Sequence, residues 1–384
     1  MHARTWLSVL SLPLVAAITL PVFHQNGTPK AQPKNGAKAA PQDPLAGLSD
    51  IQDVLSLVQQ NYVDPPDMEK VVAGGVQAVL ERAHPLNAYL SAEDLRLPDP
   101  GPAEAGLLVV KRGIYATVLS VVPGGPAAKA GIQPGDVLRK VGGDSVGRLS
   151  AWTLERRLRG PEGASVDLYR YNATGDLTKT SVPFQKLPSR AATLKQGQGG
   201  VLLALPDLAA GRTEEARRLL SGLGRNQTLV LDLRACFRGS LDEAATLAGL
   251  LGAKGTLATV NEAGKPAREV PVAGSGEPFA RLALLVGRST HGAPEALASC
   301  LKKGGARTFG ERTPGLGVQR SRFPLKQGGA VELVSQRWVG LGGEKLDRSG
   351  VVPDQILRMA DTEDALARVL TALQAPPAAS AKAS

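Results

Sequence analysis

The residues best suited to chemistry lie in the stretch STHGAPEALASC (residues 289–300), which follows the apolar run RLALLVGR. Ser289 supplies a hydroxyl group, and His291 supplies an imidazole that exchanges protons near neutral pH. An apolar strand, a small-residue turn and an Ala/Leu-rich helix form a common mount for a hydroxyl nucleophile and its base. At the residue where this mount would present the nucleophile, the sequence has Gly292.

Other reactive side chains in or near this stretch could replace the missing nucleophile only from a shifted position. Adjacent residues on one turn point apart, so we interpret Ser289 and His291 as loop residues and keep a shifted hydroxyl–imidazole pair as the alternative. A nucleophilic Cys236 would need a nearby cation, and Arg238 is the local candidate. We predict that Cys236 and Cys300 are buried small hydrophobes, and the sequence leaves open whether they form a disulfide bond.

No metal or cofactor site is predicted. The four histidines lack the spacing of metal ligands, and the two cysteines are too few for a zinc ribbon. The GLGGEK segment (residues 340–345) lacks the spacing and context of a phosphate loop, which favours a turn. Asp242 and Glu243 open an expected helix, where acidic side chains are stabilised by the helix dipole without any catalytic role.

Charge and composition argue against nucleic-acid binding. The net charge is +10, from 45 basic and 35 acidic residues, but the basic residues are scattered rather than clustered. Aromatic residues make up only 4% of the 384 residues, too few for a base-stacking surface. The 43% hydrophobic content is nevertheless enough for the cores of two or three domains.

The two ends of the chain do not look like parts of a core. A basic head and an apolar run over residues 6–23 predict that residues 1–24 are either a cleaved export signal or a membrane anchor. Residues 25–45 are rich in Pro, Lys, Ala and Gly and predict a disordered linker, and residues 374–384 predict a disordered tail.

Between these ends the residue pattern changes twice. Residues 46–98 have apolar residues at helical spacing, and residues 104–187 alternate short strands with Gly/Pro turns. Residues 198–373 follow a strand–helix–strand order, in which TLVLDLR and RLALLVG are expected to be strands buried on both faces. The sequence therefore predicts an α+β multidomain protein.

Residues 121–146, VVPGGPAAKAGIQPGDVLRKVGGDSV, resemble a PDZ domain of the bacterial protease-associated type. The resemblance implies that a backbone loop holds the carboxylate of a peptide, which adds as a strand beside a helix expected at residues 150–159. The loop is carried by Gly106, Leu107, Leu108 and Val109, with Leu108 in place of a glycine. A β-domain that only packs against its neighbours is the alternative.

The flanking motifs extend this resemblance over residues 48–357. LVLDLRACFRGSLDEAATLAGLL, ALLVGRSTHGAPEALASCL, TFGERTPGLGVQ and GVVPDQIL occur in the order typical of carboxyl-terminal processing, or tail-specific, peptidases. The resemblance implies a helical N-terminal segment, a PDZ domain and an α/β, crotonase-like peptidase core. It also implies a serine–lysine catalytic pair assisted by a glutamine, which cleaves substrates recognised by their carboxyl termini.

The sequence departs from the family pattern at the catalytic positions. Anchored on Glu295, the pattern places the nucleophile at Gly292 and the lysine at Leu316, while Gln319 is retained. Arg238 replaces a glycine of the turn near the oxyanion site. These substitutions predict a proteolytically inactive protein.

The sequence thus predicts a protein of the bacterial cell envelope that binds extended or carboxyl-terminal peptides. We expect a periplasmic location, free or anchored to the inner membrane through the N-terminal segment, and an active protease relative as a further partner. A working serine endopeptidase with a non-standard centre is the alternative, and an envelope scaffold without a peptide ligand is a third interpretation.

Overall fold

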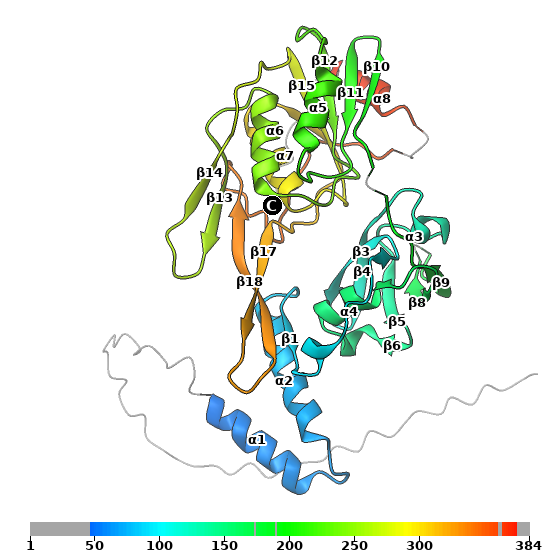
Figure 1. The fold of residues 1–384 in the computed structure, drawn as a ribbon, viewed down its shortest axis with the longest axis vertical. Helices are drawn as coiled ribbons and strands as arrows, with labels where there is room; N and C mark the ends of the chain where they lie inside the picture. The colour runs from blue at the N-terminus through cyan, green and yellow to red at the C-terminus, as the bar shows by residue number, and fades with distance from the viewer. Residues whose placement is uncertain (1–46, 173, 189, 360–362, 375–384) are drawn as a thin grey trace, which may run out of the picture. The chain divides into compact units, whose positions relative to one another are not determined.

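The computed structural model describes residues 47–172, 174–188, 190–359 and 363–374 (Figure 1). The predicted export segment, the predicted linker and all but the first residue of the predicted tail lie outside the described residues. Within the described ranges, no helix has both the length and the apolar character needed to cross a bilayer. The chain divides after Pro66 into two compact units.

The described part of the first unit is essentially one amphipathic helix, α1 (Leu48–Asn61). Its N-cap, Gly47, has no side chain with which to cap the helix. The apolar side chains of Leu48, Ile51, Val54 and Leu57 are each 50–59% exposed. Within the described residues of its own unit, α1 therefore leaves its apolar positions uncovered.

Helix α2 (Met68–Ala83) opens the larger unit. The helix begins at Asp67 because this carboxylate accepts a hydrogen bond from the Lys70 N–H at 3.2 Å, which satisfies one free donor of the first turn. After α2 the chain forms strand β1 (Ala88–Leu90), which pairs antiparallel with β18 (Ala330–Val339).

A β-rich module follows. Its sheet has the order β3-β4-β5-β8-β9, all antiparallel, with β6 paired to β5 and a separate β2–β7 pair. Alternate strand residues such as Leu138 and Leu168 fill its aliphatic core. The elements are β2 (Ala103–Glu104), β3 (Leu107–Arg112), β4 (Tyr115–Val121), α3 (Pro126–Lys129), β5 (Val137–Val141), β6 (Asp144–Ser145), α4 (Ala151–Arg157), β7 (Arg159–Gly160), β8 (Ser165–Tyr171) and β9 (Leu177–Pro183).

The α/β module contains a second sheet of order β10-β11-β12-β15-β16-β19. The pairs from β11 to β19 are parallel, and β10 is antiparallel at the edge. The elements of this sheet and its helices are β10 (Thr193–Gly197), β11 (Gly200–Ala204), α5 (Arg212–Leu220), β12 (Thr228–Asp232), α6 (Leu241–Leu250), β15 (Arg281–Val286), α7 (Ala293–Lys303), β16 (Arg307–Gly310), β19 (Gln355–Ile356) and α8 (Ala365–Gln374).

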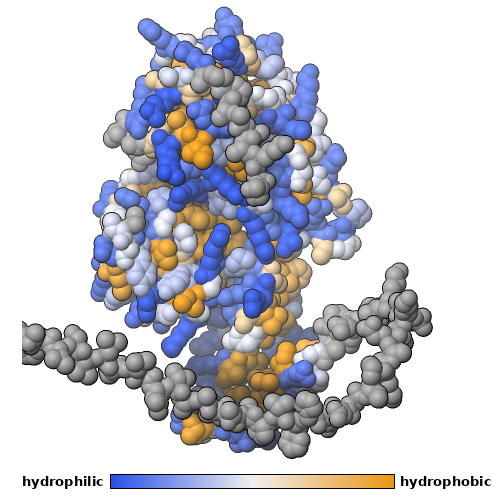
Figure 2. Space-filling view, turned by 180° about the vertical axis from the view of Figure 1, so that it is seen from behind, coloured by the Kyte–Doolittle hydropathy of each residue, from blue (hydrophilic) through white to orange (hydrophobic). Residues whose placement is uncertain are grey.

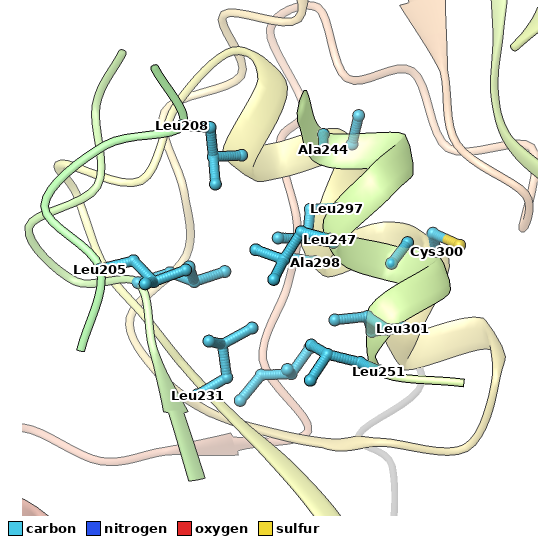
Figure 3. Close-up of a cluster of buried hydrophobic side chains, with 14 of the residues drawn as sticks. Leu205, Leu208, Leu231, Ala244, Leu247, Leu251, Leu297, Ala298, Cys300 and Leu301 are labelled. Carbon is cyan, nitrogen blue, oxygen red and sulfur yellow. The ribbon is translucent and has the colours of Figure 1, made fainter. Parts of the chain in front are cut away.

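Helices cover both faces of this sheet. Helices α5, α6 and α7 share one core with strand residues such as Leu231 and Leu284, and Figure 3 shows the facing side chains of α6 and α7. Helix α8 packs on the opposite face, against Ala283 and Phe309. Burial on both faces explains why β12 and β15 read as continuous apolar runs.

A third, antiparallel sheet joins β1, β18, β13 (Thr256–Glu262) and β14 (Arg268–Pro271), with β17 (Val318–Pro324) forming a hairpin with β18. Figure 2 shows a surface on which hydrophilic residues predominate and apolar residues form scattered patches. That surface fits the dispersed charges of the sequence.

Candidate functional site

Gly292 occupies the turn between β15 and α7, at the N-cap of the helix. Its backbone has φ 71° and ψ −129°, a conformation that residues with a side chain rarely adopt. A Cβ atom built on Gly292 would lie 4.0 Å from the nearest atom, the backbone oxygen of Leu316. The position has room for a side chain, and it is backbone strain that favours glycine there.

The carboxylate of Glu295 holds this turn against the loop that contains Leu316. Its Oε2 accepts hydrogen bonds from the N–H groups of Gly292 at 3.0 Å and Leu316 at 2.8 Å. Its Oε1 accepts from the Gly315 N–H at 2.7 Å and the Thr313 hydroxyl at 2.5 Å. Glu295 is fully buried, so these four donors replace the water that its carboxylate has lost.

Two opposing effects act on the proton of Glu295. Burial raises the pKa of its carboxyl to about 7, while the hydrogen bonds from Thr313, Leu316, Gly315 and Gly292 act to lower it. Thr313 is itself held because its hydroxyl accepts from the Val351 N–H at 2.7 Å. The sequence predicts no role for Glu295 beyond its place in the family motif, although a Glu three residues into a helix is typical of an N-terminal cap.

Leu316 and Gln319 lie on the facing loop and on β17. Leu316 is half-buried and forms an isolated antiparallel bridge with Asp347. Gln319 follows on β17, opposite Gln336, and is exposed. The fold therefore brings the positions of Gly292 and Leu316 together across the Glu295 carboxylate, whereas the side chain of Gln319 lies at the surface.

The residues just before Gly292 have structural partners. The Thr290 hydroxyl is fully buried, donates to the Leu233 carbonyl at 2.7 Å and accepts from the Gly287 N–H at 3.0 Å. His291 Nδ1 donates to the Ser289 carbonyl at 2.9 Å, and the imidazole stacks on Phe237 at 6.1 Å. Burial lowers the pKa of His291 to about 4, so the ring is neutral at pH 7. The fold places His291 against the Ser289 backbone.

Both cysteines are free and buried. Burial raises the pKa of the Cys236 thiol well above its usual value, and it raises that of Cys300 to about 11. Cys300 donates to the Thr256 carbonyl at 3.7 Å, and it lies at the edge of the cluster of α6 and α7 side chains in Figure 3. The sequence left a disulfide bond open, and in the structure Cys236 and Cys300 are two free thiols.

Arg238, in the turn after β12, has its guanidinium on Glu104 of the β-rich module. Its Nη2 donates to both Glu104 oxygens, at 2.9 and 2.8 Å. The next residue, Gly239, cannot be replaced easily, because a Cβ there would come within 2.4 Å of Leu208. The turn therefore has a glycine at position 239, where a side chain would clash, and Arg238 forms an ion pair with the β-rich module.

Known proteins resemble this chain over most of its length. The model of peptidase family S41 matches residues 201–357, and a PDZ-domain model matches residues 117–168. A probable CtpA-like serine protease of Staphylococcus aureus (strain MSSA476) is 25% identical over 323 residues, which cover 80% of this chain and 64% of the relative. An S41 peptidase domain, a PDZ domain and a CtpA-like relative together support the carboxyl-terminal processing peptidase family for this chain.

A second relative supports the family, and a solved structure supports the fold. The chloroplastic carboxyl-terminal-processing peptidase 2 of Arabidopsis thaliana is 30% identical over 263 residues, covering 64% of this chain and 50% of that protein. The solved structure of a photosystem II D1 C-terminal processing protease superposes with a TM-score of 0.66 at 23% identity, covering 81% of this chain and 87% of that one. The predicted family and fold class are confirmed: a helical N-terminal part, a PDZ domain and an S41 peptidase core.

Within the PDZ domain, the expected carboxylate loop is short. Gly106 has φ 75°, and a Cβ there would lie 3.2 Å from the Pro126 ring, so glycine is favoured by both backbone and space. Leu107, Leu108 and Val109 already belong to strand β3 rather than to a loop. In the described sheet β3 pairs only with β4, which leaves its other edge open beside α4. An open edge is what a peptide needs in order to add as a strand.

Other candidate sites of the sequence have plain structural roles in this family member. The described residues contain no group of three or more His, Cys, Asp or Glu side chains arranged to hold a metal ion. The GLGGEK segment forms a turn in which the Gly340 N–H donates to the Glu344 carbonyl at 2.9 Å. Asp242 and Glu243 lie in the first turn of α6, and Glu243 accepts from the Thr213 N–H at 2.5 Å.

Proposed function

We propose that this family member is proteolytically inactive and acts by binding extended or carboxyl-terminal peptides through its PDZ domain in the bacterial cell envelope. The observation that carries the proposal is the pairing of Gly292 with Leu316 at the strand–turn–helix position. Glycine has no atom that attacks a carbonyl, and leucine has none that accepts a proton.

The remaining parts of the site do not replace this pair. Acyl transfer also needs donors that face the developing oxyanion. Arg238 stands in the turn after β12, and its guanidinium is engaged by Glu104. Gln319 is exposed on β17, so the retained glutamine has no catalytic pair to assist. Changes at Gly292, Leu316 and Arg238 together favour the loss of proteolysis, rather than the shift of one catalytic residue to a neighbouring position.

The residues that could substitute for the catalytic pair are poorly suited to that role in the folded structure. His291 directs Nδ1 to the Ser289 carbonyl, and its lowered pKa makes it a weak base at pH 7. Cys236 is fully buried, and its raised pKa keeps the thiol protonated. A working endopeptidase built on Ser289, His291 or Cys236 would therefore have to rearrange before reacting.

Peptide binding is supported by the edge strand of the PDZ domain. The open edge of β3 offers backbone groups to an incoming strand, and α4 lies beside it. Gly106 keeps the backbone at the start of β3 in a left-handed conformation, next to the residues expected to hold a carboxylate. Unstructured tails of envelope proteins are the proposed ligands, and an active relative is the proposed partner.

Location in the envelope rests on residues 1–24, whose basic head and apolar run are typical of export segments. The protein is proposed to be periplasmic, either released or anchored to the inner membrane. Fractionation of cells that express the full chain, followed by N-terminal sequencing of the recovered protein, tests this. Recovery in the cytoplasm with an intact start would contradict export, and recovery in the membrane fraction with that start would indicate an anchor.

A cleavage assay tests inactivity. Purified full-length protein is incubated with unstructured polypeptides that carry apolar carboxyl termini, and we expect no fragments by mass spectrometry. Cleavage that disappears in Ser289→Ala or Cys236→Ala, but persists in the exposed control Ser221→Ala, would establish the active endopeptidase instead. A covalent adduct of an electrophilic probe at one residue beside Gly292 would likewise overturn the proposal.

A binding assay tests the peptide function. Fluorescent peptides with a free apolar carboxyl terminus are expected to bind at least tenfold more tightly than the same peptides with an amidated end. Leu108→Asp, on β3, should abolish binding, whereas Leu177→Asp, on the far edge strand β9, should not. Equal, unsaturable signals for both peptides would favour the scaffold interpretation.

A further inference from the structure

A cavity of about 460 Å³ lies at one end of the sheet of the α/β module, and Gly292 lies at the other end. It is lined at the starts of β15 and β16 and at the ends of α6 and α7, whereas Gly292 follows the carboxyl end of β15. Six strand residues at about 3.3 Å each separate the two ends by about 20 Å. The cavity is therefore distinct from the degenerate catalytic position.

The lining of the cavity combines large apolar side chains with polar groups, among them two arginines. The large apolar residues that line it are Leu251, Phe279, Leu282, Leu301 and Leu373. Leu251 and Leu301 appear together at the lower ends of α6 and α7 in Figure 3. Since a water molecule takes about 30 Å³ of liquid, the volume corresponds to on the order of 15 water-sized groups. That size lies within the usual range of small-molecule pockets, about 300–1,000 Å³.

Arginines lie at or just before the N-terminal ends of three neighbouring parallel strands. Arg281 and Arg307 are the first residues of β15 and β16 and line the cavity. Arg225 lies three residues before β12, with its guanidinium 4.3 Å from the ring centroid of Phe279. The strand order β12-β15-β16 makes these strand ends neighbours, although the residues are far apart in the sequence.

Part of this positive charge has no partner within the described chain. The Arg281 side chain makes no ion pair or hydrogen bond with the described residues, and Arg225 Nη1 is buried without a hydrogen-bond partner. Arg307 Nη1 donates to the Leu373 carbonyl at 3.3 Å. The described residues that line the cavity include no Asp or Glu. Glu277, which comes just before the lining residue Pro278 in the sequence, has an exposed side chain.

We infer that this cavity binds a small carboxylate with an unbranched apolar chain, the chemistry of a medium-chain fatty acid. The carboxylate would pair with Arg281, and the chain would lie against Leu251, Leu301 and Phe279. A peptide fits less well, because β15 is paired on both sides by β12 and β16, so this cavity presents no free strand edge to a peptide backbone.

Titration calorimetry of the full-length protein with octanoate tests the inference. Octanoate is expected to bind saturably with one site, and octanol, which lacks the carboxylate, at least tenfold more weakly. Arg281→Gln should reduce octanoate affinity at least tenfold, and so should Ala280→Phe, which fills the cavity and keeps the arginine. Arg218→Gln, at an exposed arginine on α5, should leave affinity unchanged.

Four outcomes would overturn the inference. Octanoate binding that is lost in Leu108→Asp and kept in Arg281→Gln would place the carboxylate in the PDZ groove. An acetylated tripeptide with a free carboxyl terminus that binds more tightly than octanoate, in an Arg281-dependent way, would make the ligand a peptide. Equal binding of octanoate and octanol, or no binding to a protein whose circular dichroism shows it folded, would remove the carboxylate site.

Discussion

The N–H of Leu316 donates a 2.8 Å hydrogen bond to Glu295, so the loop that faces Gly292 is tied to the first turn of α7. The same carboxylate oxygen accepts from Gly292 at 3.0 Å. A single buried side chain thus fixes the distance between the two positions at which this family is expected to carry its catalytic pair. The carboxylate of Glu295 therefore holds the Gly292 turn and the Leu316 loop in a fixed relation.

Replacing Glu295 should destabilise the protein. In Glu295→Gln an amide NH₂ replaces one of the two carboxylate oxygens. Each oxygen accepts two hydrogen bonds in the wild type, so in the variant two buried donors face the NH₂ group, which cannot accept from them. We expect the free energy of unfolding to fall by about 1–3 kcal/mol in denaturant titrations. Glu214→Gln, at a 62% exposed side chain paired with Arg217, serves as the matched control and should change it by less than about 1 kcal/mol. Equal losses in both variants would contradict the role given to Glu295.

The stability contribution of Glu295 should depend on pH with a defined sign. Its pKa is raised from 4.5 to about 7 in the folded protein, so between these values the folded state binds more protons than the unfolded state. The contribution is therefore fully present below pH 4.5 and lost as pH rises through 7. The unfolding free energy of wild type minus that of Glu295→Gln should fall across this window, and a rising difference would show that the carboxylate stays ionised.

His291 should give the opposite slope. Burial lowers its pKa from 6.5 to about 4, so the folded state binds fewer protons between these values. The contribution of the neutral ring is present above pH 6.5 and is lost as pH falls towards 4. The difference between wild type and His291→Gln should therefore increase with pH, measured in the same buffers. A flat difference would place the imidazole in contact with solvent.

Restoring side chains at the catalytic positions should not restore proteolysis. Gly292→Ser fits sterically, since the nearest atom to a Cβ is 4.0 Å away, but the positive φ should cost about 1–3 kcal/mol of stability. We expect the double variant Gly292→Ser, Leu316→Lys to fold and to release no fragments, because Arg238 still occupies the turn that the family pattern is expected to use near its oxyanion site. Activity in the double variant would show that only two side chains separate this chain from an enzyme.

The two thiols should be inert in the folded protein. Cys236 is 0% and Cys300 is 2% exposed, and burial raises the pKa of both. We expect no labelling by iodoacetamide at pH 8 in native buffer and two labels per chain after unfolding in guanidinium chloride, counted by mass spectrometry. Rapid native labelling of Cys236 would reopen the alternative of a cysteine centre.

Local pattern was sufficient for much of the fold. The apolar runs of β12 and β15 were predictable because strands buried on both faces need apolar residues at nearly every position. The expected helix at residues 150–159 corresponds to α4, where the Ser150 side chain accepts from the Thr153 N–H. Even so, Leu107, Leu108 and Val109 were predicted as a loop, although they belong to β3, because a Gly-flanked apolar segment fits both descriptions.

The sequence by itself was enough to predict the family and the order of the modules, and it has Gly292 and Leu316 where the family motif is expected to carry serine and lysine. The tertiary structure decided that Glu295 joins Gly292 to Leu316, that Arg238 reaches Glu104 and that arginines gather where three strands begin. These contacts join residues up to 134 positions apart. They depend on strand order and register, which are set by the packing of the whole sheet and leave no periodic trace in any one segment.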